Sequence, residues 1–335
     1  MPPLVAPFAL SLPALAGRYV VRQQAEAAPA LPPAYAPWLY LTPAHQALQQ
    51  AGGEALHFFL EEPATGRTVA QLPVFLPAVT VARSPGMAPF AAVQTAPDLP
   101  EPALEAFLAV VEARLAARGV RHLRLRPHAF VYEPAASARL AAVLTRRGYR
   151  VALAEINHHL ALGRDYAAHL HPSEQRRLRK CARHGLIFEQ EPPLLLPLAY
   201  EFLSRCRQEK GQELSMSLGQ LEALFRALPR QVFLFSVRDA AGEWAALTVA
   251  IQVREDVLYN FYPASPLAYN ALSPVVLLNA GLHAFGRASH MRLLDLGTST
   301  LPEGGLNQSL LQFKRHLGGV PSLKLTFEKE LGGNG

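Results

Sequence analysis

A repeat constrains the fold of this 335-residue chain more than any other feature. The segment 103–118 has the apolar periodicity of a helix, and the strand-like run VRHLRLRP follows it. The segment 274–288 has the same periodicity and precedes the run MRLLDLGT. Leu123 and Leu293 occupy matching positions in the two runs, at an offset of 293 − 123 = 170. This recurrence predicts that one α/β unit occurs twice in the chain.

Two predicted β-hairpins support the duplication. Residues 56–81 alternate apolar and polar side chains around a turn at Gly66, and residues 231–253 do so around Gly242. The alternative explanation is that any two stretches of strands and helices align this well by chance. The agreement of both order and register in two separate segments favours duplication.

The composition is that of a globular chain with two hydrophobic cores. Half of the residues are hydrophobic and 17% are charged, which excludes a disordered chain. The length predicts two domains, which we place at residues 1–165 and 166–335. We predict an α/β fold with a mixed sheet in each domain, because antiparallel hairpins precede a helical crossover in both copies.

We predict a cytoplasmic protein, because the sequence shows neither a recognisable targeting signal nor a disulfide framework. No run of 18 apolar residues is present, so we predict no transmembrane segment. The apolar residues 1–20 lack a basic start and contain several prolines, and we expect them to pack on the fold. The two cysteines give no disulfide framework, as is typical of a reducing compartment.

A basic helix is predicted at residues 172–184, between the two copies. The chain has a formal net charge of +6, with 27 arginines and 5 lysines. Helical spacing places four of the basic residues of this segment on one face, namely Arg176, Arg179, Lys180 and Arg183. We predict that this face binds an anionic donor. A solvated face, an RNA-binding face and a face for an anionic membrane surface are the alternatives, and the absence of interleaved aromatic residues weakens the RNA alternative.

The strongest candidate site lies in the segment 291–319. The predicted buried strand 292–296 has Asp295 near its carboxyl end, and a loop with Thr298 and Ser299 leads into a helix that begins near Asn307. Ligands in open α/β sheets bind at the carboxyl ends of strands and at helix N-termini. We predict that Asp295 orients or deprotonates an acceptor amine. Thr298 and Ser299 either bind substrate or cap the turn.

Two further residues, Lys314 and Tyr262, belong to the predicted site. Lys314 lies two helical turns after Asn307, on the same face, and either binds a phosphate or carboxylate or is solvated. Tyr259 and Tyr262 are three residues apart on a predicted strand and therefore face opposite sides. We predict that Tyr262 donates a proton to the leaving group, with core packing as the alternative. The histidines lack the spacing of metal ligands, so we predict no metal site.

These motifs resemble the GNAT acyltransferase fold, in the tandem arrangement of FemAB-type and BioF2-like proteins. The resemblance is carried by four runs of sequence, which are RRLRK at 176–180, LYNFY at 258–262, LDLGTS at 294–299 and LQFK at 311–314. It implies transfer of an acyl or aminoacyl group from acyl-CoA or aminoacyl-tRNA to an amine or hydroxyl by direct attack. A small molecule or a peptidoglycan or other cell-envelope precursor is the implied acceptor, and Asn260 of the second run is an implied substrate contact.

The two copies differ at the candidate site. Leu125 and Pro127 occupy the positions of Asp295 and Gly297, so the polar residues are not required by the fold. We therefore predict that the site lies in the C-terminal domain. The alternative is a binding protein that retains the fold without catalysis. Residues 263–274 lack the glycines of the pyrophosphate-binding loop that the resemblance implies. Phe313 stands where these enzymes usually have a tyrosine that acts as the general acid.

Overall fold

The computed structural model contains two compact units. The first consists of residues 1–155 and 323–335, and the second of residues 156–322. The described residues are 8–12, 15, 17–49, 53–301 and 304–332. The units differ from the predicted boundary, because residues 156–165 lie in the second unit and residues 323–335 lie in the first.

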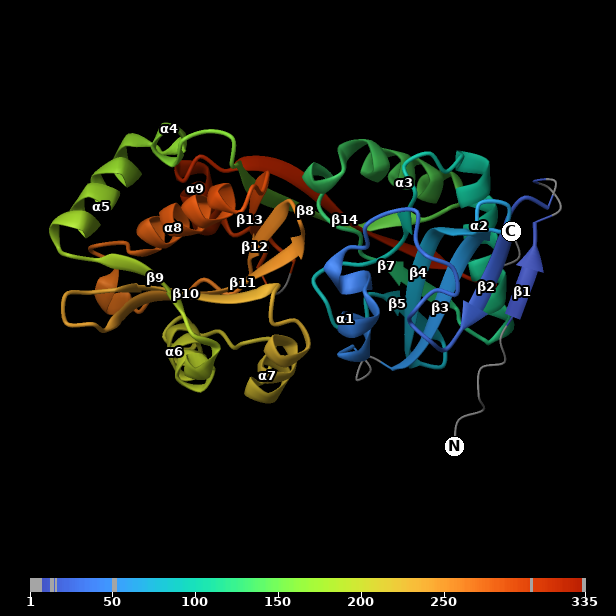
Figure 1. Ribbon diagram of the computed structural model, residues 1–335, viewed down its shortest axis with the longest axis horizontal. Coiled ribbons are helices and arrows are strands. Elements are labelled where there is room, and N and C mark those ends of the chain that lie inside the picture. Colours follow the sequence, from blue (N-terminus) through green and yellow to red (C-terminus); the bar gives the residue numbers. More distant parts are fainter. Residues whose placement is uncertain (1–7, 13–14, 16, 50–52, 302–303, 333–335) are drawn as a thin grey trace. The chain divides into compact units, whose positions relative to one another are not determined.

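The first unit is a mixed sheet with helices packed on it (Figure 1). Its strands are β1 (Phe8–Ser11), β2 (Val20–Gln24), β3 (Glu54–Glu62), β4 (Arg67–Ala78), β5 (Val81–Ser84), β6 (Gln94–Thr95) and β7 (His122–Leu125). Its helices are α1 (Pro43–Ala47), α2 (Glu101–Ala117) and α3 (Pro134–Arg146). Leu104, Phe107, Leu108 and Val111 of α2 are buried against the sheet at the spacing of one helix face.

The second unit has helices on both faces of its sheet (Figure 1). Its strands are β9 (Ile187–Glu191), β10 (Val232–Arg238), β11 (Trp244–Arg254), β12 (Val257–Asn260) and β13 (Leu293–Thr298). Its helices are α4 (Tyr166–His169), α5 (Pro172–Arg183), α6 (Leu196–Gln208), α7 (Leu218–Ala227), α8 (Val275–Ala288) and α9 (Gln308–His316). Helix α8 packs across β9, β10, β11 and β13, and α5 packs on α8. The predicted hairpin at 231–253 is confirmed as β10 and β11.

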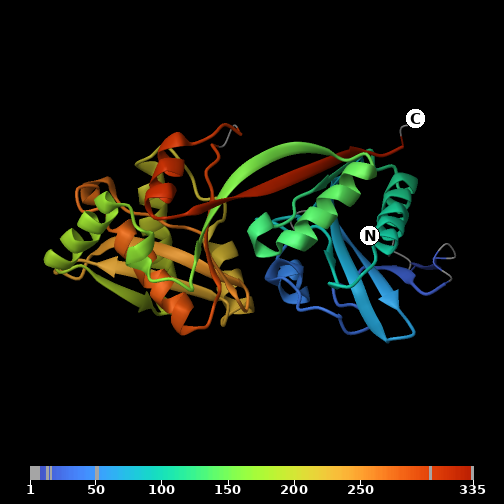
Figure 2. The same cartoon turned by 90° about the horizontal axis from the view of Figure 1, so that it is seen from above.

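Two long strands explain the difference in domain boundaries. They are β8 (Arg150–Ala161) and β14 (Val320–Glu330), which are neighbours in the sheet (Figure 2). Strand β8 ends the first copy yet pairs with β13 of the second, and β14 ends the second copy yet pairs with β7 of the first. Each copy therefore supplies the strand that extends the sheet of the other, because the backbone hydrogen bonds of β7 and β13 are completed in this way.

The predicted repeat is present in the order of elements. The series α2, β7, α3, β8 of the first copy recurs as α8, β13, α9, β14 in the second. Gly148 and Gly318, which match at an offset of 170, both end a helix in the left-handed region, with φ of 80° and 81°. The equivalent elements thus end with equivalent backbone geometry.

The expectation for residues 1–20 lies partly outside the described residues. Within the described part, Phe8–Ser11 forms β1 and pairs antiparallel with β2. Among the described residues, we find no helix long and apolar enough to span a bilayer.

Candidate functional site

Three neighbouring strands bring Asp295 into a row with two ring side chains. Tyr259 of β12 is the register partner of Asp295, and Asp295 is the register partner of His159 in β8. Because side chains alternate along a strand, these three lie on one face of the sheet. Leu258 and Leu294 alternate onto the opposite face, where they join the core beneath α8. The face that carries Asp295 is therefore the one opposite α8.

The carboxylate of Asp295 is held in one orientation. Only 4% of the residue is exposed. Its Oδ1 accepts a hydrogen bond of 2.8 Å from Asn157 Nδ2 and one of 2.7 Å from the backbone N–H of Gly297. Gly297 has φ of 74°, which favours glycine, and the pairing with β8 shifts register between Asp295 and Gly297. The bulge turns the Gly297 N–H back to the carboxylate, which offsets the cost of burying its charge.

Lys314 fixes the backbone that follows Asp295. Its side chain extends from α9, is almost fully buried, and donates hydrogen bonds of 2.9 Å to the Gly297 carbonyl and 2.6 Å to the Thr298 carbonyl. Burial lowers the pKa of Lys314 to about 8, although the nearby charge of Asp295 acts to raise it. The Lys314 amine, predicted either to bind an anion or to be solvated, therefore anchors the carboxyl end of β13.

The lowered pKa of Lys314 predicts a pH-dependent stability. Below pH 8 the buried ammonium is charged in the folded protein, and above pH 8 it loses its proton while the unfolded chain keeps one until about pH 10.5. Folding stability relative to a Lys314→Met variant should therefore rise between pH 8 and pH 10.5, by at most about 3 kcal/mol. Urea unfolding of both proteins at several pH values measures this difference, and a constant difference would contradict the assignment.

Two buried histidines of β8 border the same region. Burial, together with the smaller effect of the neighbouring Lys314 charge, lowers the pKa of His158 to about 4. Burial also lowers the pKa of His159, against the opposing effect of Asp295. Both rings are therefore neutral near pH 7, and within the described part their Nδ1 atoms have no hydrogen-bond partner. No pattern in the sequence selects Asn157 or His159 as site residues, because the pairing of β8 with β13 is not visible in it.

The loop residues have mixed surroundings. Ser299 is fully buried, its backbone N–H donates to the Ile156 carbonyl at 3.1 Å, and its hydroxyl has no partner among the described residues. Asn307 caps α9, because its Oδ1 accepts from the Leu310 N–H at 3.0 Å. Thr298 is half-buried and offers its carbonyl to Lys314. The structure thus places the predicted loop residues around the Asp295 bulge.

Asn260 lies on the other face of the sheet from Asp295. It follows Tyr259 directly, so its side chain points toward α8. There its Oδ1 accepts from the Thr248 hydroxyl at 2.7 Å, and its Nδ2 donates to Asn279 of α8 at 3.2 Å. These bonds give Asn260 a packing role between the sheet and α8, at a distance from the face that carries Asp295.

Tyr262 follows β12 and is buried. Its phenol is hydrogen-bonded to the Ser215 hydroxyl in the segment between α6 and α7. Burial raises the pKa of Tyr262, so the phenol keeps its proton at neutral pH. Its ring stacks on Phe261 with centroids 4.1 Å apart, and Phe261 lies 5.6 Å from Tyr259. A row of aromatic rings therefore runs from the Asp295 row to Tyr262.

The predicted basic face of α5 is exposed. Glu174 and Cys181 are buried on one side of the helix, and Arg176, Arg179 and Arg183 lie on the exposed side. Lys180 instead donates a hydrogen bond of 2.8 Å to the Ala271 carbonyl. That bond joins α5 to the loop that leads into the N-terminus of α8. Across the described ranges, no cluster of three or more His, Cys, Asp or Glu side chains is arranged to hold a metal ion.

Comparison with known proteins gives structural matches only. No family model matches the sequence, and no curated protein matches it. The crystal structure of FemX superposes with a TM-score of 0.67 at 13% identity, over 86% of this chain and 91% of that one. A tandem GNAT protein from the clavulanic acid biosynthesis pathway superposes with a TM-score of 0.53 at 15% identity, over 93% of each chain.

A third protein also superposes on most of the chain. It is the C-terminal domain of a putative lysylphosphatidylglycerol synthetase from Agrobacterium fabrum, with a TM-score of 0.55 at 13% identity, over 86% of this chain and 87% of that one. At such identities the likeness establishes the fold. Each match covers most of both chains, in agreement with the repeated order of elements, so this protein has the tandem GNAT fold.

Proposed function

We propose that this protein is an acyltransferase with its active site at Asp295. The observation that carries the proposal is a buried carboxylate held by Asn157 and by the Gly297 N–H at the bulge in β13. Its counterpart in the first copy is Leu125, so neither the fold nor its stability requires a charge there. A buried charge that folding does not need is characteristic of a functional site.

The proposed reaction is direct attack by an amine or hydroxyl on an activated acyl carbonyl. Asp295 takes the proton of the nucleophile as the new bond to the acyl carbon forms. The bond from that carbon to the sulfur or oxygen of the donor then breaks, and the phenol of Tyr262 supplies a proton to the departing group. Lys314 holds the Gly297 and Thr298 carbonyls, which keeps the bulge around Asp295 rigid.

The proposed donor carries phosphate groups. Arg176, Arg179 and Arg183 form an exposed basic face, and Lys180 of the same helix is bonded to the loop before α8. The N-terminus of a 14-residue helix attracts anions, and arginine side chains bind phosphate in the same way as carboxylate. Acyl-CoA and aminoacyl-tRNA both carry phosphate groups. The proposed acceptor is a small molecule or a cell-envelope precursor with a free amine or hydroxyl.

A donor screen tests the proposal. We expect a coenzyme A thioester or an aminoacyl-tRNA to raise the melting temperature of the full chain, because a ligand of the folded state stabilises it. Replacing Arg176, Arg179 and Arg183 with Gln should weaken donor binding by about tenfold or more, most strongly at low salt. The matched control replaces Arg164, Arg226 and Arg230, which are also exposed in the second unit, and should bind as the parent does. Equal weakening by both sets would contradict a specific donor face.

A further inference from the structure

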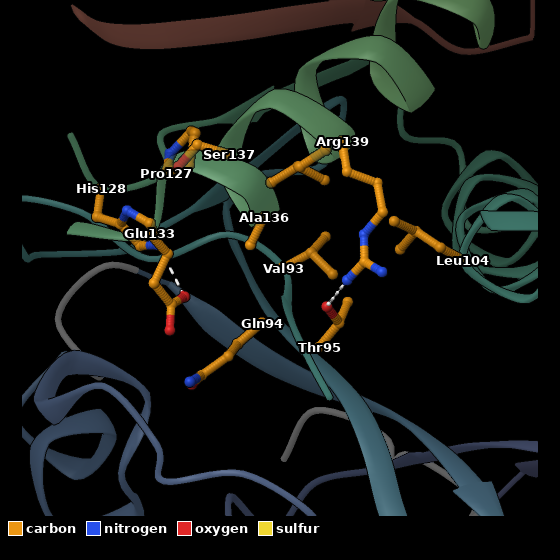
Figure 3. A pocket seen from close by; sticks show the side chains of 11 residues that line it. Val93, Gln94, Thr95, Leu104, Pro127, His128, Glu133, Ala136, Ser137 and Arg139 are labelled. Carbon is orange, nitrogen blue, oxygen red and sulfur yellow. Dashed lines mark hydrogen bonds and ion pairs between the residues drawn. The ribbon is translucent and has the colours of Figure 1, made fainter. Parts of the chain in front are cut away.

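A cavity lies in the first unit, at the N-terminus of α3 (Figure 3). Its empty volume is about 390 Å³, including the part that opens to solvent. Apolar side chains from α2 and α3 form part of its wall. The polar side chains of the wall are Gln94, Thr95, His128, Glu133, Ser137 and Arg139.

The first turn of α3 leaves hydrogen-bond donors unused. Glu133 occupies the N-cap position, and its side chain makes no capping hydrogen bond. The N–H of Ser137 is the first to bond back into the helix, to the Glu133 carbonyl at 2.9 Å. The N–H groups of Ala135 and Ala136 precede it and have no intrahelical acceptor. Ala136 lines the cavity, so this helix end presents donors to it.

The repeat shows that this end is not an ordinary cap. Ser137 matches Asn307, whose side chain caps α9. Helix α3 begins four residues earlier relative to the repeat, at Pro134, so Ser137 lies inside the first turn and does not cap it. Ser137 is only 7% exposed and lines the cavity, and within the described part its hydroxyl has no hydrogen-bond partner. A buried hydroxyl without a partner is unfavourable unless a ligand or water completes it.

The charges around the cavity favour an anion. The Arg139 guanidinium donates to neutral oxygens, namely Thr95 Oγ1 at 2.9 Å and the carbonyls of Leu99 at 2.9 Å and Pro97 at 3.2 Å. The one carboxylate of the wall belongs to Glu133, whose Oε2 lies 3.6 Å from His128 Nε2. Figure 3 shows Glu133 and Arg139 at opposite sides of the cavity. The positive charge of the wall is therefore on the Arg139 side, away from Glu133 at the N-cap of α3.

We propose that this cavity binds an oxyanion group, either a carboxylate or a phosphate monoester. Its oxygens accept hydrogen bonds from the Ser137 hydroxyl and the Ala136 N–H, and Arg139 supplies the compensating charge. The site belongs to the first unit and is independent of the acyltransferase proposal. The ligand therefore binds to the first copy, which has Leu125 at the position of Asp295.

Intrinsic fluorescence of Trp38 reports on this cavity. The backbone N–H of Trp38 donates to Gln94 Oε1 at 3.0 Å, and its ring lies 4.9 Å from that of His128. The chain has two tryptophans, so Trp244→Phe makes Trp38 the only one. Sodium phosphate and sodium acetate are titrated into this variant of the full chain at constant ionic strength, with sodium chloride as the reference salt.

We expect a saturable change with at least one of the two anions. Ser137→Ala should weaken that binding by about tenfold, because it removes one donor to a charged oxygen and leaves the helix intact. Thr145→Ala, an exposed position on the same helix, is the matched control and should leave the binding unchanged. Tighter binding of phosphate identifies a phosphate ester as the ligand, and tighter binding of acetate identifies a carboxylate.

Two outcomes would overturn the proposal. One is the absence of a saturable change with either anion, and the other is binding that Ser137→Ala leaves unaltered. Ser137→Asp provides a second check, because a fixed negative charge in the cavity should abolish binding of both anions. Thermal unfolding of each variant shows whether the protein tested is folded.

Discussion

Asp295→Asn is expected to lower the rate of acyl transfer by about 10²- to 10⁴-fold, the range typical of a lost general base. The amide has nearly the shape of the carboxylate, and its oxygen can still accept from Asn157 and from the Gly297 N–H. The fold and donor binding should therefore persist, whereas the group that takes the proton is gone. Rates are measured with the donor identified by the thermal screen and an amine acceptor, and Asp165→Asn, on an exposed side chain, is the control.

A second measurement on the same variant shows whether Asp295 is charged near Lys314. The attraction of Asp295 raises the pKa of Lys314 against the effect of burial, so its removal should lower that pKa below about 8. The pH range over which Lys314 affects stability should then begin at a lower pH than in the parent protein. Full transfer activity in Asp295→Asn would show that Asp295 is not the base.

Gly318→Ala is expected to destabilise the protein by about 3–5 kcal/mol. Gly318 ends α9 with φ of 81°, and a Cβ there would lie 2.3 Å from the carbonyl oxygen of His169. Backbone atoms cannot rotate away as a side chain can, so α9 or the α4 segment has to move. Urea or thermal unfolding measures the loss.

The repeat provides a matched control at Gly148. This glycine has φ of 80°, and no atom lies within 4 Å of the position of an added Cβ. Gly148→Ala therefore has the same backbone strain without the clash, and it should cost only about 1–2 kcal/mol. Similar losses in the two variants would show that the contact between Gly318 and His169 relaxes without difficulty.

The sequence predicts most of the architecture, because its elements are strongly periodic. The hairpin at 231–253, the helix at 172–184 and the offset between α3 and α9 all follow from local patterns that the structure confirms. The exchange of β8 and β14 does not follow from them. Strand periodicity determines which face of a strand is buried, but it does not determine which strand lies next to it. The predicted boundary between residues 165 and 166 therefore differs from the units of the structure.

The sequence identifies part of the candidate site, but not the residues that reach it through strand pairing. Asp295 could be selected because a charge in an apolar strand requires a reason, and the other copy has Leu125 in its place. Asn157 could not, because it is 138 residues away and meets Asp295 only through the pairing of β8 with β13. The roles of Asn307 as a cap and Asn260 as a contact to α8 depend on side-chain direction, which composition and spacing leave undetermined.

The exchange of β8 and β14 also determines when each sheet can be completed during folding. Leu125 of β7 pairs with Phe327 of β14, 327 − 125 = 202 residues later in the chain. While the ribosome is still making the second copy, β7 has no β14 to accept its hydrogen bonds, and this edge of the first unit is open. Contacts of such long sequence separation form slowly and leave sheet edges exposed to other chains. The sheet of the first unit is therefore completed at β7 only after the whole second copy has been synthesised.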